Sequence, residues 1–364
     1  MDGPATRPPP EAVGEGIATG RRPASHAAVV AAVQAELDRV LAPHLDPPGP
    51  YAVVGYPRGR NIGEYLMWLG TVEHLRRRGI RPVYVCDRTS YARHELAARL
   101  GGQGTILHAG GGNLGDLWPH EQRFREQVLE DFPGARIVQL PQSMHFIRDE
   151  SLERAQKVFA AHPDYTLLLR DPASFAAARE AFGPRAALSP DLAFGMSPLP
   201  ATPAVPRGIL WLARGDHESR HPPGDLPAEV RRWDWATGHG RPFAWALGRR
   251  LGATLAGDGR ARRPRAAADA GHALVALAGE RLAQDHLARG VNQLAAAEVV
   301  VTDRVHGHIL TLLCGRPQVV LDNEDGKVHA LVRGWTGKSP LVHLATSAEE
   351  ALEKATVLRV GRLP

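Results

Sequence analysis

Cysteine is scarce in this 364-residue chain, and both copies, Cys86 and Cys314, lie within apolar stretches. Such cysteines are typical of small core residues in a reducing compartment rather than of a disulfide framework. The first 25 residues are rich in proline and lack the apolar core of a signal peptide. No run is long enough to cross a bilayer. These absences predict a cytoplasmic protein without a transmembrane segment.

A strong charge excess is also missing, because the net charge is only +5, with arginine far outnumbering lysine. This small and diffuse positive charge does not predict binding of nucleic acid, but it is compatible with a phosphorylated substrate. A basic patch at residues 260–265 leaves peripheral contact with an anionic membrane or polymer open, although a solvated loop is the simpler interpretation. No sequence signal indicates an oligomeric state.

The length and the 43% of hydrophobic residues are sufficient for two domains with separate cores. Strand and helix patterns alternate, and a proline-rich linker at 198–207 interrupts them. We therefore predict an α/β fold of two Rossmann-like domains facing a cleft. The expected parts are a disordered tail (1–25), a first domain with a lead-in helix (26–200), a second domain (201–346), and a C-terminal helix and tail (347–364). This last helix is expected to pack back on the first domain.

Residues 298–327 carry the most informative pattern. A β-branched run at 298–302 predicts a buried strand, a helix is expected from about 306 to 315, and a second strand at 318–322. Arg304 and His306 fall where the first strand ends and the helix begins. The carboxyl ends of parallel strands are common ligand sites, and the N–H groups and dipole of a helix N-terminus favour anions. The stretch predicts an anion-binding site.

A second candidate stretch begins after the strand expected at 105–108. Gly110, Gly112 and Gly115 formally satisfy the dinucleotide pattern G-x-G-x-x-G. The context disfavours a nicotinamide cofactor, because Pro119 reads as the first residue of the following helix and leaves the glycines in a loop. The next strand also ends without an acid that could hold a ribose. Close approach of a substrate to a glycine loop is the preferred interpretation.

Several motifs occur together and in order over residues 51–337. They are NIGE at Asn61, GGGNLGDLWP at Gly110, LPQS at Leu140, LRDPASF at Leu169, PDLAF at Pro190, LARGDHE at Leu212, TDRVHGHI at Thr302 and PQVVLDNEDGK at Pro317. In this set the chain resembles the polysaccharide pyruvyl transferase family. The resemblance implies a fold similar to the two-domain GT-B glycosyltransferases. It also implies transfer of the enolpyruvyl unit of phosphoenolpyruvate, as co-substrate, onto two hydroxyls of one sugar to give a cyclic pyruvate ketal.

The resemblance places the family's donor-binding arginine and catalytic histidine on Arg304 and His306, and a further anion-binding position on Arg170. We expect His306 to deliver the proton that the enol carbon needs. The complete expected site is catalytic His306 and Arg304; donor-binding Arg170, Arg214, His308, Asn323 and Lys327; and acceptor-binding Asn61, Glu64, Gly112, Asn113 and Asp116. No other cofactor and no metal is expected.

Some of these residues have alternative roles. His308 could serve helix packing, Asp116 could stabilise a loop, and Lys327 could be simply solvated. Asp171 reads as a helix N-cap and Asp191 as a brace for its loop. Glu64 stands where an aspartate is commoner after N-x-G, and Asp325 replaces an aromatic residue, so the acceptor's identity stays open.

Other functions remain open from the sequence. One is a GT-B glycosyltransferase that uses a nucleotide sugar, although no nucleotide motif is recognisable. Another is a non-catalytic carbohydrate-binding protein of the same fold. The His306–His308 spacing allows two zinc ligands, but no third ligand is obvious beyond His329. The acceptor could be a free, lipid-linked, nucleotide-linked or polymeric sugar.

Overall fold

The computed structural model describes residues 25–46, 48–57, 59, 61–102, 104–199, 205–215, 220, 224–235, 246, 250, 265–324 and 326–361. The tail at 1–24, the middle of the linker at 200–204, the patch at 260–264 and Asp325 lie outside these residues. The predictions made for them are therefore not addressed below.

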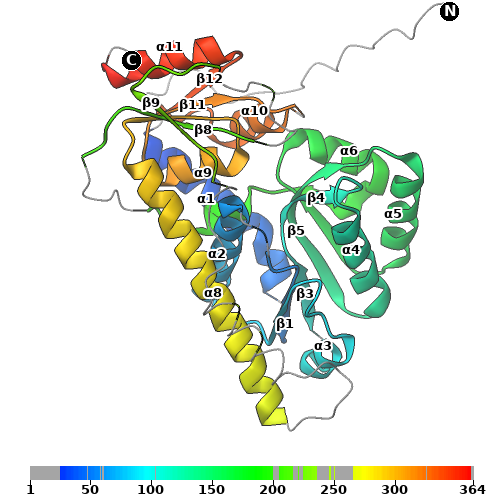
Figure 1. The fold of residues 1–364 in the computed structure, drawn as a ribbon. Helices are drawn as coiled ribbons and strands as arrows, with labels where there is room; N and C mark the ends of the chain where they lie inside the picture. Colours follow the sequence, from blue (N-terminus) through cyan, green and yellow to red (C-terminus); the bar gives the residue numbers. More distant parts are fainter. Residues whose placement is uncertain are drawn as a thin grey trace, which may run out of the picture.

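The first half of the described chain builds a parallel sheet in the order β2–β1–β3–β5–β6–β7, with β4 paired to β5 off this path (Figure 1). The strands are β1 Tyr51–Val54, β2 Tyr84–Cys86, β3 Thr105–His108, β4 Gly111–Gly115, β5 Arg136–His145, β6 Tyr165–Leu169 and β7 Ala186–Leu188. The helices are α2 Ile62–Arg77, α3 Arg93–Leu100, α4 Pro119–Asp131, α5 Asp149–Ala161 and α6 Pro172–Phe182. Because β2 and β3 lie on opposite sides of β1, the strand order reverses between β1 and β3.

The second half builds another parallel sheet in the order β12–β11–β10–β8–β9. Its strands are β8 Ile209–Leu212, β9 Val230–Trp233, β10 Val299–Thr302, β11 Gln318–Leu321 and β12 Val342–Ala345. Its helices are α8 Arg265–Ala295, α9 Val305–Leu313, α10 Lys327–Leu331 and α11 Ala348–Arg359. The strand–helix–strand unit predicted from 298–322 is confirmed as β10–α9–β11. Here the strand order reverses between β8 and β10.

The expected position of the C-terminal helix is wrong. Helix α11 packs on β8, β10, β11 and β12 of the second sheet, not back on the first domain (Figure 1). Its small residues Ala351 and Ala355 are fully buried against Ile209 and Val319. Alanines four residues apart lie on one helix face and allow close contact with the sheet, so α11 covers an apolar face that its own sheet needs to bury.

Two other helices join the halves instead. The long helix α8 packs on α2, where the Tyr65 and His286 rings stack 4.5 Å apart. The lead-in helix α1 (His26–Leu45) lies against the short helix η2 (Leu192–Gly195) and contributes Leu37 and Leu41 to a core shared with Leu66 and Leu210. Because this apolar core contains side chains from both sheets, it fixes the two halves against one another.

The glycine stretch also differs from its prediction. Gly111–Gly115 is strand β4, paired with the carboxyl part of β5 in the register Gly111↔Gln142 and Gly115↔His145. The strand forms because β5 is ten residues long, and its carboxyl part, beyond the residues paired with β3, offers a further edge. The start of α4 at Pro119 and the N-cap role of Asp171, whose carboxylate accepts from Ser174 N at 2.8 Å, are confirmed.

Candidate functional site

A cavity of about 770 Å³ lies between the carboxyl ends of the two sheets. Gly55 and Gly110, which follow β1 and β3 in the chain, line the cavity from the first half. Arg214 and Arg304, which follow β8 and β10, line it from the second half. These are the two points at which strand order reverses, where open parallel sheets bind their ligands. The polar and charged lining is Asn61, Glu64, Thr71, Asp87, Arg88, Asn113, Glu121, Arg170, Arg214, Arg304, His306, Asn323 and Lys327.

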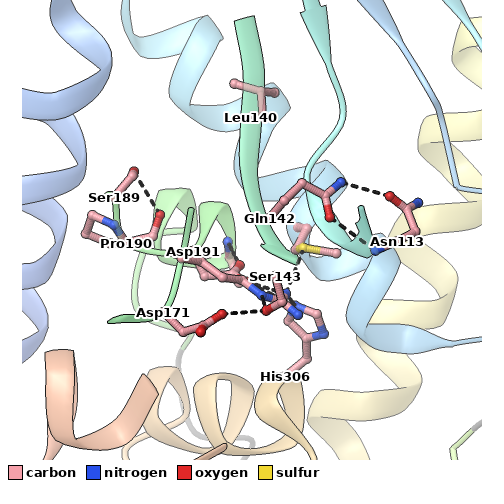
Figure 2. A network of polar contacts seen from close by, with 12 residues as sticks. Asn113, Leu140, Gln142, Ser143, Asp171, Ser189, Pro190, Asp191 and His306 are labelled. Atoms are coloured by element: carbon pink, nitrogen blue, oxygen red, sulfur yellow. Dashed lines mark hydrogen bonds and ion pairs between the residues drawn. The ribbon is translucent and has the colours of Figure 1, made fainter. Parts of the chain in front are cut away.

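One wall of the cavity holds an ionic cluster of Arg170, Asp191 and His306. Asp191 and His306 are labelled in Figure 2. Arg170 Nη1 donates to Asp191 Oδ2 at 2.8 Å, and the same oxygen lies 3.3 Å from His306 Nε2. Asp191 is fully buried and also caps η2 by accepting from Ala193 N at 2.7 Å. The expected bracing role of Asp191 is present, but its carboxylate additionally joins an arginine of the first half to a histidine of the second.

The cluster has a defined resting charge. Burial alone would raise the pKa of Asp191, but His306 and Arg170 outweigh it and hold that pKa well below its usual range. Burial lowers the pKa of His306, more than Asp191 raises it, and the charges of Arg170 and Arg214 act in the same direction as burial. We therefore take Asp191 as ionised and His306 as neutral near pH 7, since Arg170 suffices as the partner of Asp191.

The nitrogen Nε2 of His306 faces both other members of the cluster. Arg170 Nη1 lies 3.1 Å from it and Asp191 Oδ2 lies 3.3 Å from it. A guanidinium only donates, so Nε2 accepts from Arg170 when it carries no proton. When the ring is protonated, Nε2 turns into a donor towards Asp191. Protonation thus exchanges one hydrogen-bond partner of His306 for another without moving the ring.

Gly63, in the first turn of α2, permits the approach of His306. A Cβ atom at this position would lie 2.6 Å from the His306 Cβ and closer still to Nδ1. The helix start is fixed by Asn61, whose side chain accepts from Gly63 N at 3.0 Å. The glycine of the N-x-G sequence therefore serves a contact between distant segments that the sequence alone does not reveal.

Replacing Gly63 with alanine is expected to displace His306. Since the neighbouring atoms are the base of a side chain and not its flexible end, we expect about a 100-fold loss of activity, of the size that misplacement of a reacting group causes. The matched control is Gly134→Ala, in the turn between α4 and β5, where an added Cβ meets nothing within 4 Å and the backbone does not have a positive φ. Steady-state kinetics of both variants, with circular dichroism to verify folding, measure the effect. Wild-type kinetics for folded Gly63→Ala would contradict it.

Arg304 begins α9 and is held from three sides. Its Nη2 donates to Asp234 at 2.6 Å, its Nε donates to Ala213 O at 3.2 Å, and its guanidinium lies 5.8 Å from the centre of the Trp235 ring. Sequence reasoning missed Asp234 and Trp235, because β9 was not predicted and no motif includes them. These contacts fix the guanidinium at the cavity, beside the N–H groups of the first turn of α9.

The expected acceptor residues Asn61, Glu64, Gly112 and Asn113 all line the cavity. Burial, with a smaller contribution from Glu121, raises the pKa of Glu64 to about 7, although hydrogen bonds from Asn61 and Gly59 oppose the rise. Glu64 is thus a carboxyl group that exchanges its proton near neutral pH. This is the property required of a general acid or base.

Two expected site residues do not reach the cavity. His308 is fully buried, with Nδ1 3.0 Å from Gln318 Oε1 and Nε2 2.7 Å from Thr336 Oγ1. Asp116 accepts from Ile147 N and Arg148 N at 2.8 and 2.9 Å and stabilises their loop. Helical geometry explains His308: two residues beyond His306, it points to a different face of α9.

Asn323 and Lys327 lie at the second sheet's end of the cavity, after β11. The Asn323 side-chain oxygen accepts from Lys327 N at 3.1 Å, so part of its hydrogen-bonding capacity serves the start of α10. In the described ranges, no cluster of three or more His, Cys, Asp or Glu side chains is arranged to hold a metal. Within the same ranges, no helix combines the length and apolarity needed to span a bilayer.

Comparisons with solved structures support the fold. A crystal structure of a functionally uncharacterised protein from Klebsiella pneumoniae aligns with a TM-score of 0.54 over 86% of this chain and 99% of that one. The two sequences are only 15% identical, so this similarity concerns the α/β fold alone.

Sequence comparisons identify the family. Residues 61–247 and 274–325 match the model of polysaccharide pyruvyl transferases. Pyruvyl transferase 1 of Schizosaccharomyces pombe is 31% identical over 78% of this chain and 69% of its own length. EpsO of Bacillus subtilis, provisionally named a pyruvyl transferase, is 30% identical over 81% of this chain and 88% of its own. The segments matched by the family model contain most of the cavity-lining residues of both halves, and the chain belongs to the polysaccharide pyruvyl transferase family.

Proposed function

We propose that this cavity transfers the enolpyruvyl group of phosphoenolpyruvate onto two hydroxyls of a sugar within a glycan or its precursor, forming a cyclic ketal and releasing phosphate. The observation that carries the proposal is the Arg170–Asp191–His306 cluster, which places a titratable imidazole in a cavity with Arg214, Arg304 and Lys327. Membership of the family supports pyruvyl transfer, and the geometry of the cavity supports the residue roles proposed below.

The donor fits the cationic side of the cavity. Phosphoenolpyruvate carries a carboxylate and a phosphate, both of which a planar guanidinium can bind through two parallel hydrogen bonds. Arg170 and Arg304 are held firmly by Asp191 and Asp234, so they lose little freedom when the ligand binds. The N-terminus of α9 adds its own attraction for an anion.

The reaction proceeds in four steps. His306 gives a proton to the methylene carbon of the enol, and a sugar hydroxyl adds to the neighbouring carbon. Phosphate then leaves, and the second hydroxyl closes the ketal. The protons of the two hydroxyls balance the reaction. One makes up for the proton that His306 gave to the new methyl group, and the other leaves with phosphate. Glu64, with its pKa of about 7, is suited to accept a hydroxyl proton.

Glu64→Gln is expected to lower kcat by about 100-fold or more, the usual contribution of a general base. A base works only when it is deprotonated, so wild-type activity should rise with pH through about 7, and this limb should vanish in Glu64→Gln. Glu64→Asp retains a carboxylate and should keep part of the activity with its pH dependence. Profiles of rate against pH measure both variants. If the activity of Glu64→Gln rose with pH as that of wild type does, Glu64 would not be the general base.

The binding test separates the proposal from its enzymatic rival. Phosphoenolpyruvate is expected to raise the thermal unfolding midpoint, because a ligand bound only by the folded state stabilises it. Uridine and guanosine diphosphates, tested alongside it, should leave the midpoint unchanged. Stabilisation by a nucleotide and not by phosphoenolpyruvate would instead favour a nucleotide-sugar glycosyltransferase. Phosphoenolpyruvate binding without phosphate release across many acceptors would favour a non-catalytic protein.

A further inference from the structure

Asn113, in β4, lines the cavity with a side-chain amide whose orientation is chemically determined. Its Oδ1 lies 2.8 Å from Arg125 Nη2. The same oxygen lies 2.9 Å from Gln142 Nε2 (Figure 2). Arginine can only donate hydrogen bonds, so the atom facing Arg125 must be the oxygen. Gln142 is fixed in turn, because its Nε2 also donates to Ala109 O at 3.1 Å and its Oε1 accepts from Asn113 N. The Nδ2 of Asn113 is therefore the branch directed away from these partners.

Arg125 is a buried cation below this strand, on α4, and only 1% of its surface is exposed. Besides Asn113, it donates to Gln139 Oε1 at 2.6 Å and to Gln122 Oε1 at 2.8 Å. Gln122 Oε1 also accepts from Gly115 N at 3.1 Å. One guanidinium thus fixes three side-chain amides, and through them the strand that forms a wall of the cavity.

Strand β4 passes beside the ionic cluster at Gly112, the neighbour of Asn113. A Cβ atom on Gly112 would lie 3.3 Å from Arg170 Nη2. At this corner Asn113 offers two N–H groups, since its oxygen is already engaged. A hydroxyl both donates and accepts, whereas an ionised carboxylate or phosphate oxygen only accepts. A donor-only amide that lines the same cavity as Arg170 is complementary to the anion.

We propose that Asn113 Nδ2 binds a carboxylate or phosphate oxygen of the donor substrate, and that Arg125 is the positioning residue that aims it. This assignment rests on the proposed function, and it places Asn113 in the donor site rather than in the acceptor site. Arg125 itself touches no substrate.

Asn113→Asp tests the assignment without a change of shape. The variant still accepts from Arg125 and Gln142, and its carboxylate pairs with a buried cation, so its unfolding midpoint should equal or exceed that of wild type. It loses both N–H groups and repels an anion. We expect at least a 10- to 100-fold higher Kd for phosphoenolpyruvate by titration calorimetry, the range for a lost hydrogen bond to a charged group. The KM of the acceptor should stay within about twofold, because neutral hydroxyls can still donate to the new carboxylate.

Arg125→Met, alone and combined with Asn113→Asp, tests the positioning. Alone it should weaken phosphoenolpyruvate binding about 10-fold, and in the Asn113→Asp background it should have little further effect, because coupled residues are non-additive. If Arg125→Met fails to fold, Asn113→Asp decides the assignment of Asn113 alone. Pyruvate and inorganic phosphate, titrated separately, identify which anionic group Asn113 binds. Asn113→Asp should lower the affinity only for the probe that carries that group.

The outcomes separate this inference from the proposed function. Unchanged phosphoenolpyruvate affinity in folded Asn113→Asp, or a loss confined to acceptor KM, would overturn the assignment and leave the function intact. Independent, additive losses in the double variant would overturn the role of Arg125. Absence of phosphoenolpyruvate binding to the wild-type protein would overturn the proposed function and this assignment with it.

Discussion

His306→Gln is expected to lower pyruvyl transfer by about 10³-fold or more while phosphoenolpyruvate binding stays within a few-fold. Glutamine is similar in size and can still donate to Asp191, so the cluster should remain folded. What it cannot do is deliver a proton, and general acid catalysis by histidine contributes about 10² to 10⁴-fold. The measurement is phosphate release under saturating donor and acceptor.

The same variant tests when His306 becomes charged. In the free protein its pKa lies below the ordinary value because the ring is buried. The negative charges of the bound donor should raise this pKa, so binding near pH 7 should take up a fraction of a proton and weaken as the pH rises. Calorimetry in buffers of different ionisation enthalpy measures the uptake, which His306→Gln should lack. The exposed His94 provides the control: His94→Gln should keep wild-type activity and uptake. Equal proton uptake by wild type and His306→Gln would exclude His306 as the group that is charged.

Asp191→Asn is expected to affect both stability and catalysis. It leaves the buried Arg170 without its carboxylate, and breaking a buried ion pair in this way costs about 3 kcal/mol or more. It also removes the charge that favours the protonated form of His306, so kcat should fall by about 100-fold or more. Chemical denaturation and steady-state kinetics measure the two losses.

The pH dependence gives this variant a further signature. A carboxyl group whose folded pKa is depressed stabilises the protein above its unfolded pKa of about 4 and loses that contribution as the pH falls further. Wild type should therefore lose stability more steeply below about pH 4 than Asp191→Asn does. Asp131→Asn, at a carboxylate bonded to Tyr91 outside the cavity lining, is the control and should keep wild-type kinetics. Parallel acid-unfolding profiles of wild type and Asp191→Asn would contradict the assignment.

Local patterns were sufficient to predict much of the fold. The unit β10–α9–β11 was readable because a β-branched run, a helix start and a Gly–Pro stop follow one another within thirty residues of sequence. The position of α11 was not, because the amphipathic pattern of a helix does not say which of two sheets its face will cover. Strand β4 was missed for a related reason. Glycines have little strand propensity, and the strand exists only because β5 supplies an edge far along the chain.

The candidate site divides in the same way. The sequence placed Arg304 and His306 together because they are neighbours at one strand end, and the motifs added Arg170 and Asn113. It gave no indication that Asp191 bridges Arg170 to His306, or that Asp234 holds Arg304, since these contacts join residues more than twenty positions apart. His308 was included because it neighbours His306 in the motif, but the direction of a side chain on a helix is set by its angular position.

The central claim is that the Arg170–Asp191–His306 cavity binds phosphoenolpyruvate and makes a pyruvate ketal. Incubating the protein with phosphoenolpyruvate and a panel of glycosides, followed by mass spectrometry, tests it most directly. The account predicts an acceptor heavier by one pyruvic acid less one water, one phosphate released per product, and neither product with His306→Gln. An unmodified panel from protein that binds phosphoenolpyruvate, or equal product from His306→Gln, would contradict it.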